Sequence, residues 1–110
     1  MQYVVANRVP VKAEYRAEFE ERFRRRAGEV DKQPGFVRME ILRPVNDDGL
    51  YVVLTHWVDQ AAFEAWMKSA DFKTAHTNPL PKEAFGEGGG IERHEVIIHS
   101  GFGGPPPRSN

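Results

Sequence analysis

The chain has 110 residues, of which 40% are hydrophobic and 28% charged, a composition typical of a single globular domain with one modest core. Its net charge of -1 gives no electrostatic support for nucleic-acid binding, and the absence of cysteine excludes disulfides, zinc–thiolate sites and thiol catalysis. No apolar run approaches membrane-spanning length, and residues 1–9 lack the features of a signal peptide, so we expect a cytoplasmic protein with no membrane partner.

The first part of the chain predicts a strand, a helix and a turn. Residues 2–9 alternate in the manner of a strand, and Pro10 is expected to end it because proline cannot donate to a ladder. An apolar stripe at helical spacing predicts a helix over residues 13–30. Pro34-Gly35 then indicates a turn.

The middle of the chain predicts a hairpin followed by a broken helix. Residues 36–43 and 50–58 have the pattern of two antiparallel strands joined by a short turn-forming link. Asp59 can cap the next helix, and the polar pair Ser69 and Asp71 indicates that this helix breaks and restarts.

The last part is expected to hold a loop, a strand and a tail. Residues 79–90 contain two prolines and four glycines, which predicts a mobile loop. Residues 91–99 predict a final strand, and residues 100–110 a flexible tail rich in proline and glycine.

This order of elements is that of the ferredoxin-like split βαβ, an α+β fold. It assigns residues 1–99 to one domain. The helices are expected to cover one face of the sheet, whereas the other face still carries apolar residues. A second copy of the chain would cover that face most simply, so we expect a homodimer.

Asn7 is the strongest functional signal among the individual residues. It falls in the inward-facing series of the first strand with Tyr3 and Val5, where burying an unpaired amide costs about 1–3 kcal/mol. Either a neighbouring loop satisfies this amide, or the amide is a donor held ready for a bound ligand.

Trp66 and His76 lie on either side of the predicted helix break. On one straight helix they would fall on different faces, but a bend between them lets both address one cavity. Trp66 fits plain core packing as well as contact with a flat ligand. His76 fits a helix cap or a surface position as well as an axial ligand of a planar iron cofactor such as haem.

Several segments of the chain resemble one family. They are Val5-Ala6-Asn7-Arg8, Glu21-Arg22-Phe23 with Arg26-Ala27-Gly28, Pro34-Gly35-Phe36, Phe63-Glu64-Ala65-Trp66-Met67-Lys68-Ser69 and Phe72-Lys73-Thr74-Ala75-His76. Over residues 2–99 the chain resembles bacterial haem-degrading monooxygenases of the staphylococcal haem oxygenase type, within the antibiotic-biosynthesis monooxygenase superfamily.

The resemblance implies a dimeric α+β barrel that binds one haem per subunit. His76 would be the proximal iron ligand, Trp66 would press on the macrocycle, and Asn7 would hydrogen-bond the distal ligand. These three are the expected catalytic residues, and Phe23 would line the pocket.

Arg22 and Arg26 flank the apolar stripe of the first helix. Either could reach a haem propionate as a charge-assisted pair, while the neighbouring arginines are expected to form a solvated face.

The function implied by the resemblance is oxidative opening of haem, which serves as both cofactor and substrate, with release of iron. The reaction would need O2 and an external electron donor, because the sequence has no flavin or nicotinamide motif. Two alternatives stay open: a cofactor-independent monooxygenase of a phenolic or quinol substrate, and a haem-binding protein without enzymatic activity.

Overall fold

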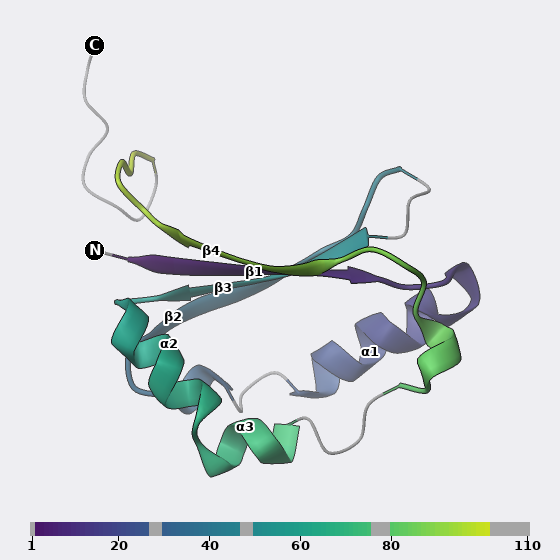
Figure 1. Ribbon diagram of the computed structural model, residues 1–110, viewed down its shortest axis with the longest axis horizontal. Helices are drawn as coiled ribbons and strands as arrows, with labels where there is room; N and C mark the ends of the chain where they lie inside the picture. The colour runs from purple at the N-terminus through teal and green to yellow at the C-terminus, as the bar shows by residue number, and fades with distance from the viewer. Residues whose placement is uncertain (1, 27–29, 47–49, 76–79, 102–110) are drawn as a thin grey trace.

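The structure is a computed structural model that describes residues 2–26, 30–46, 50–75 and 80–101 (Figure 1). Its strands and α-helices are β1 (Tyr3–Pro10), α1 (Arg16–Arg26), β2 (Phe36–Leu42), β3 (Leu50–Trp57), α2 (Gln60–Met67), α3 (Ala70–Ala75) and β4 (Gly90–Glu95). Short 3-10 turns lie between them at η1 (Ala13–Tyr15), η2 (Val30–Lys32) and η3 (Lys82–Ala84).

The described strands form one antiparallel sheet in the order β2-β3-β1-β4, and the helices lie on one face of it (Figure 1). This arrangement confirms the ferredoxin-like α+β fold that the element order predicts. Because β1 is flanked by β3 and β4, Asn7 lies near the middle of the sheet, opposite Val53 on one side and Ile91 on the other.

Two clusters of buried side chains hold the helices against opposite ends of the sheet. One includes Trp57, which is fully buried, and Trp66, and it packs α2 and α3. The other includes Phe19 and Tyr51, and packs α1 and the segment around η3. The middle of the sheet is therefore left between the two clusters.

Ser69 produces the predicted break between α2 and α3. Its hydroxyl donates to the carbonyl of Trp66 at 2.7 Å and accepts from the backbone N–H of Phe72 at 3.1 Å. One side chain therefore ends α2 and caps α3. Asp59 caps the start of α2 as expected, because its carboxylate accepts from the N–H of Ala62 at 2.9 Å.

The prediction of a mobile loop over residues 79–90 is wrong for residues 80–85, which pack on the domain. Leu80 is 7% exposed and Ala84 is fully buried, and both belong to the cluster under α1. Phe85 also forms an isolated β-bridge with Val11. The apolar side chains of this segment fix it on the domain despite its glycines and prolines.

The N-terminal boundaries differ from the sequence prediction in two places. Pro10 is the last residue of β1 rather than the first beyond it, and its carbonyl accepts from the N–H of Gly86 at 3.1 Å. Proline is tolerated at this position because it is the terminal residue of the strand. The helix predicted over residues 13–30 is α1, which begins only at Arg16, after η1.

The last strand is shorter than predicted. β4 ends at Glu95, so the second half of the predicted 91–99 strand lies beyond it, although the N–H of Val96 still donates to the carbonyl of Gln2 at 2.9 Å. Residues 102–110 of the predicted tail lie outside the described residues.

The second face of the sheet has no described helix over it (Figure 1). Val4, Val52 and Leu54 are half-buried on this face. His56, on the same face, is 8% exposed and forms a hydrogen bond of 3.1 Å with Glu40. The face thus combines apolar side chains with a polar pair.

Candidate functional site

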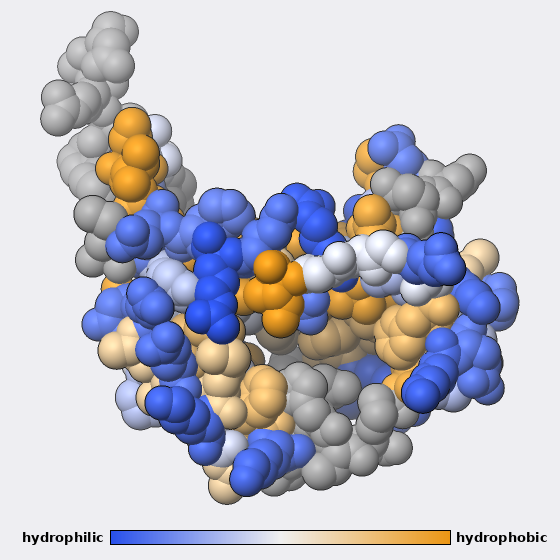
Figure 2. All heavy atoms as spheres, in the orientation of Figure 1, coloured by the Kyte–Doolittle hydropathy of each residue, from blue (hydrophilic) through white to orange (hydrophobic). Residues whose placement is uncertain are grey.

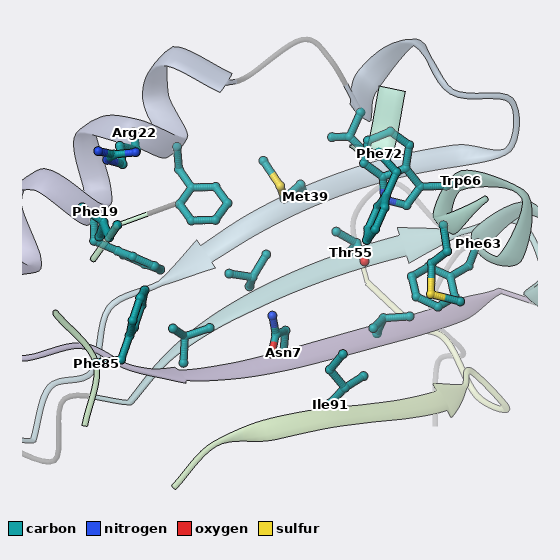
Figure 3. A pocket seen from close by; sticks show the side chains of 17 residues that line it. Asn7, Phe19, Arg22, Met39, Thr55, Phe63, Trp66, Phe72, Phe85 and Ile91 are labelled. Carbon is teal, nitrogen blue, oxygen red and sulfur yellow. The ribbon is translucent and has the colours of Figure 1, made fainter. Parts of the chain in front are cut away.

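A cavity of about 470 Å³ lies between the sheet and the helices (Figure 3). It separates the two core clusters and takes side chains from both, such as Trp66 from one and Phe19 from the other. Ligand sites in proteins commonly have volumes of about 300–1,000 Å³. Figure 2 shows the hollow in this face of the molecule, below β4, bordered by apolar atoms with hydrophilic atoms farther out on both sides.

The cavity is lined by apolar side chains with three exceptions. Among the described lining residues, Asn7, Arg22 and Thr55 are polar, and the others are aliphatic, aromatic or methionine. A surface of this kind suits a large apolar ligand that presents a few polar atoms at defined places.

Asn7 lies on the sheet wall of the cavity, and Figure 3 shows its amide pointing into the space. The side chain is half-buried, and the described part of the chain supplies no hydrogen-bond partner for the amide. Its donors and its acceptor are therefore available to a ligand. No described loop satisfies this amide, and its role toward a ligand stays a prediction.

Thr55 is a second polar group on the same wall, and it was not among the residues predicted for the site. Its hydroxyl accepts a hydrogen bond from the indole N–H of Trp57 at 3.0 Å. Because a hydroxyl also carries one proton to donate, this bond leaves a donor that can serve a ligand. Thr55 belongs to the same inward-facing alternation as Trp57, and that alternation was the available signal.

Trp66 both packs in the core and faces the cavity. It is 8% exposed and stacks on Trp57 with ring centroids 6.4 Å apart and 28° between the planes. Phe72 meets Trp66 edge-on at 5.4 Å, and both lie on the cavity wall (Figure 3). This packing holds the indole in one orientation, so the two readings of Trp66 are compatible.

Arg22 and Phe23, both on α1, line the cavity, and Figure 3 shows Arg22 at the end opposite Trp66. Both are half-buried, and Phe23 packs against Phe19 at 5.1 Å between ring centroids. A nitrogen of Arg22 lies 3.5 Å from a carboxylate oxygen of Glu18. The structure therefore brings Asn7, Trp66, Phe23 and Arg22 to one cavity.

Two predicted site residues cannot be placed. His76 lies outside the described residues, directly after the last residue of α3. Arg26 closes α1, and its side chain also lies outside the described part of the structure.

Glu20 fixes the position of α1, the helix from which Arg22 lines the cavity. Its carboxylate accepts hydrogen bonds from Arg43 at 2.6 and 2.8 Å and from the hydroxyl of Tyr51. The bonds from Arg43 and Tyr51 lower the pKa of Glu20 to about 2, and burial raises the pKa of Tyr51. No sequence pattern indicates this cluster, because its members come from different elements.

The described residues offer no group of three or more histidine, aspartate or glutamate side chains that could hold a metal ion. What the site provides is a wide apolar space, hydrogen-bond donors on the sheet wall and a cation at one end. These features bind and orient a large ligand.

Residues 2–78 match the profile of the antibiotic biosynthesis monooxygenase family. The chain belongs to this family. The chain is also 42% identical over 66 residues to a heme oxygenase (mycobilin-producing) from Mycobacterium tuberculosis, an alignment that covers 60% of this chain and 63% of that protein. The chain therefore spans less than two thirds of this relative.

Two solved structures resemble the whole domain. A heme-degrader from Mycobacterium tuberculosis, with two hemes bound in its active site, has a TM-score of 0.75 and 33% identity, covering 90% of this chain and 99% of that one. A cofactor-independent oxygenase from Streptomyces nogalater has a TM-score of 0.65 and 28% identity, covering 94% and 98%.

No helix among the described residues is long and apolar enough to cross a membrane.

Proposed function

We propose that this family member is a haem-degrading monooxygenase that binds haem as substrate, opens its ring oxidatively and releases the iron. The observation that carries the proposal is the apolar cavity with Asn7 on its sheet wall and Trp66 on its helix wall. The similarity of the chain to the mycobacterial heme oxygenase, at 42% identity, supports haem degradation as the reaction.

The cavity residues have separate tasks in this proposal. The apolar lining excludes water and holds the macrocycle. Asn7 and Thr55 donate hydrogen bonds from the sheet side, where preorganised donors stabilise negative charge that develops on oxygen. Trp66, held in place by its stacking on Trp57, would contact the ring and help to orient it.

We assign the proximal iron ligand to His76. α3 ends at Ala75, and Phe72, one turn earlier, lines the cavity, so the chain leaves α3 close to the ligand space. Bound haem supplies the redox chemistry of its own iron, with O2 as co-substrate and electrons from an external reductant.

Arg22 and Arg26 are assigned to the propionates. Arg22 lines one end of the cavity, and Arg26 follows it by one helical turn on α1. A guanidinium beside a carboxylate forms a charge-assisted hydrogen bond.

A homodimer is part of the proposal. The sheet face without a described helix carries Val4, Val52 and Leu54, and a second copy placed there closes two sheets into a barrel. The cytoplasmic location stays a prediction.

A hemin titration of the purified protein tests the function. We expect a saturable shift of the Soret band that is lost in His76→Ala. Addition of ascorbate in air, with catalase present, is then expected to bleach the band and release iron to a chelator. A bound spectrum that persists with several reductants would identify a haem-binding protein without activity, and absence of saturable binding would exclude the haem reading.

The second candidate is a cofactor-independent monooxygenase of a phenolic or quinol substrate. The similarity to the Streptomyces nogalater oxygenase, which covers 94% of this chain, favours it. This reaction needs no iron ligand, so His76→Ala would retain activity on quinols. Oxygen uptake with a quinol panel, measured without haem, separates the two candidates.

A further inference from the structure

Met39 lines the cavity beside one of the donors that the proposed function uses on the sheet wall. It is on β2, directly opposite Thr55 of β3 in the antiparallel register, and both residues line the cavity. The Cβ atoms of residues paired in this way are about 4.5–5.5 Å apart. Figure 3 shows the side chain of Met39 extending from β2 into the cavity. A thioether and a hydroxyl therefore face the same part of the ligand space.

Met67 also lines the cavity, but its surroundings differ from those of Met39. It lies on α2, and its sulfur is 3.9 Å from a guanidinium nitrogen of Arg93. The described part of the chain places no such donor on the sulfur of Met39. Both side chains are half-buried. The two methionines thus share a cavity and a degree of burial, and differ in their distance along the sheet wall from Thr55 and in the contact of the sulfur.

A thioether reacts with hydrogen peroxide because its sulfur carries a nucleophilic lone pair. The sulfur forms a bond to one peroxide oxygen, the O–O bond breaks, and the other oxygen leaves as water with the proton of the first. The sulfur is oxidised by two electrons to a sulfoxide, and the peroxide is reduced. A preorganised donor at the departing oxygen stabilises the charge that develops there, and Thr55 and Asn7 are donors on this wall.

The oxidant would come from the proposed reaction itself. Oxygen that gains two electrons and two protons from the external reductant, but is not inserted into the ring, leaves as hydrogen peroxide. Peroxide that forms at the sheet wall meets Met39 before it reaches the solvent.

We propose that Met39 is oxidised to methionine sulfoxide during turnover and that this modification weakens substrate binding. The inference rests on the proposed function, which supplies oxygen and reductant at the sheet wall. The new sulfoxide oxygen is a polar acceptor among apolar side chains, and its burial against the macrocycle is unfavourable. The by-product of the reaction thus limits the reaction, and reduction of the sulfoxide restores it.

A rival explanation is that Met39 only fills space in the core. Methionine commonly fills irregular gaps, and Met39 packs against the cluster that contains Trp57 and Trp66. Its oxidation would then follow exposure to peroxide in the solvent, with the same preference between Met39 and Met67 whether haem is present or not. The test must therefore compare the two methionines with and without the reaction in the cavity.

Peptide mass spectrometry of two samples makes this comparison. The first is the hemin complex, supplied with ascorbate in air without catalase. The second is the protein without hemin, treated with hydrogen peroxide until Met67 is oxidised to the same extent as in the first. We expect the sulfoxide at Met39, relative to that at Met67, to be several times higher in the first sample.

The matched variants Met39→Leu and Met67→Leu test the effect on binding, because leucine has a similar volume and no sulfur. Hemin affinity is measured by Soret titration before and after turnover, once small molecules have been removed. After turnover, we expect the unmodified protein and Met67→Leu to bind hemin about tenfold more weakly, whereas Met39→Leu should keep its starting affinity. Treatment with methionine sulfoxide reductases should restore the affinity of the unmodified protein.

The same ratio of Met39 to Met67 sulfoxide in the two samples would overturn oxidation by the reaction in the cavity. An equal loss of affinity in Met39→Leu would overturn the effect of the modification on binding. Either result leaves the haem assignment standing. If the unmodified protein shows no saturable hemin binding, the proposed function fails and this inference fails with it.

Discussion

The indole N–H of Trp57 donates a hydrogen bond to the hydroxyl of Thr55, at 3.0 Å. Trp57 is fully buried, so this hydroxyl is the group that satisfies the indole away from water. Thr55 also lines the cavity, and its hydroxyl keeps one proton to donate. Thr55 therefore contributes both to the stability of the fold and to the ligand-facing wall of the cavity.

Thr55→Val should destabilise the fold. The change keeps the shape but leaves the Trp57 donor buried without an acceptor, at a cost of about 1–3 kcal/mol. Urea unfolding of the protein without ligand gives the value. Thr55→Ser retains the hydroxyl and serves as the control; a Thr55→Val variant as stable as Thr55→Ser would show that this hydrogen bond is unimportant.

Asn7→Leu should keep the stability of the fold but lower the activity. The amide has no partner among the described residues, so its replacement is expected to leave the free energy of unfolding unchanged or raise it. The rate of haem bleaching should nevertheless fall by about 10²–10³, the usual effect of losing a preorganised donor. Loss of stability together with unchanged bleaching would contradict both statements.

Glu20→Gln should weaken the attachment of α1 by about 1–3 kcal/mol at neutral pH, since charged hydrogen bonds to Arg43 and Tyr51 are lost. The pKa of Glu20 falls from its usual 4.5 to about 2 on folding, so the carboxylate stabilises the fold above pH 4.5 and loses this effect as the pH falls toward 2. Urea unfolding at several pH values should show the two proteins converging over that range. A difference in unfolding free energy that stays constant over this pH range would exclude the titration of Glu20 as its cause.

Ser69→Ala should loosen the junction of α2 and α3. The hydroxyl caps α3 through the N–H of Phe72, and losing such a cap costs about 0.5–2 kcal/mol. Ser69→Asp keeps an acceptor and should restore most of the stability. Because His76 follows α3, Ser69→Ala is also expected to bind hemin more weakly, which the Soret titration measures. Equal hemin affinity in Ser69→Ala and Ser69→Asp would argue that α3 does not position the iron ligand.

Local patterns in the sequence predicted most of the fold. Strand alternation placed Asn7 on the inner face, and the polar Ser69 inside an apolar helical pattern marked the α2–α3 break. These signals depend on near neighbours in the chain, which is why they could be read without tertiary structure.

The features that the sequence did not reveal depend on contacts between residues far apart in the chain. The bonds from Arg43 to Glu20 join residues 23 positions apart, a separation that helical spacing cannot reveal. The glycines and prolines around Ala84 indicate a loop, although the apolar residues of this segment determine its packing. Thr55 was overlooked because a small hydroxyl among valines is a weak signal without its partner.

The cavity divides the interior into two clusters, each held by a different part of the helix layer. A ligand that fills it would join both clusters into one continuous core, so binding and folding become linked. At a ligand concentration of 100 times the dissociation constant, this linkage adds about 2.7 kcal/mol to stability. The substrate would then act as a temporary structural element of the domain, and the domain would loosen again each time that substrate is consumed.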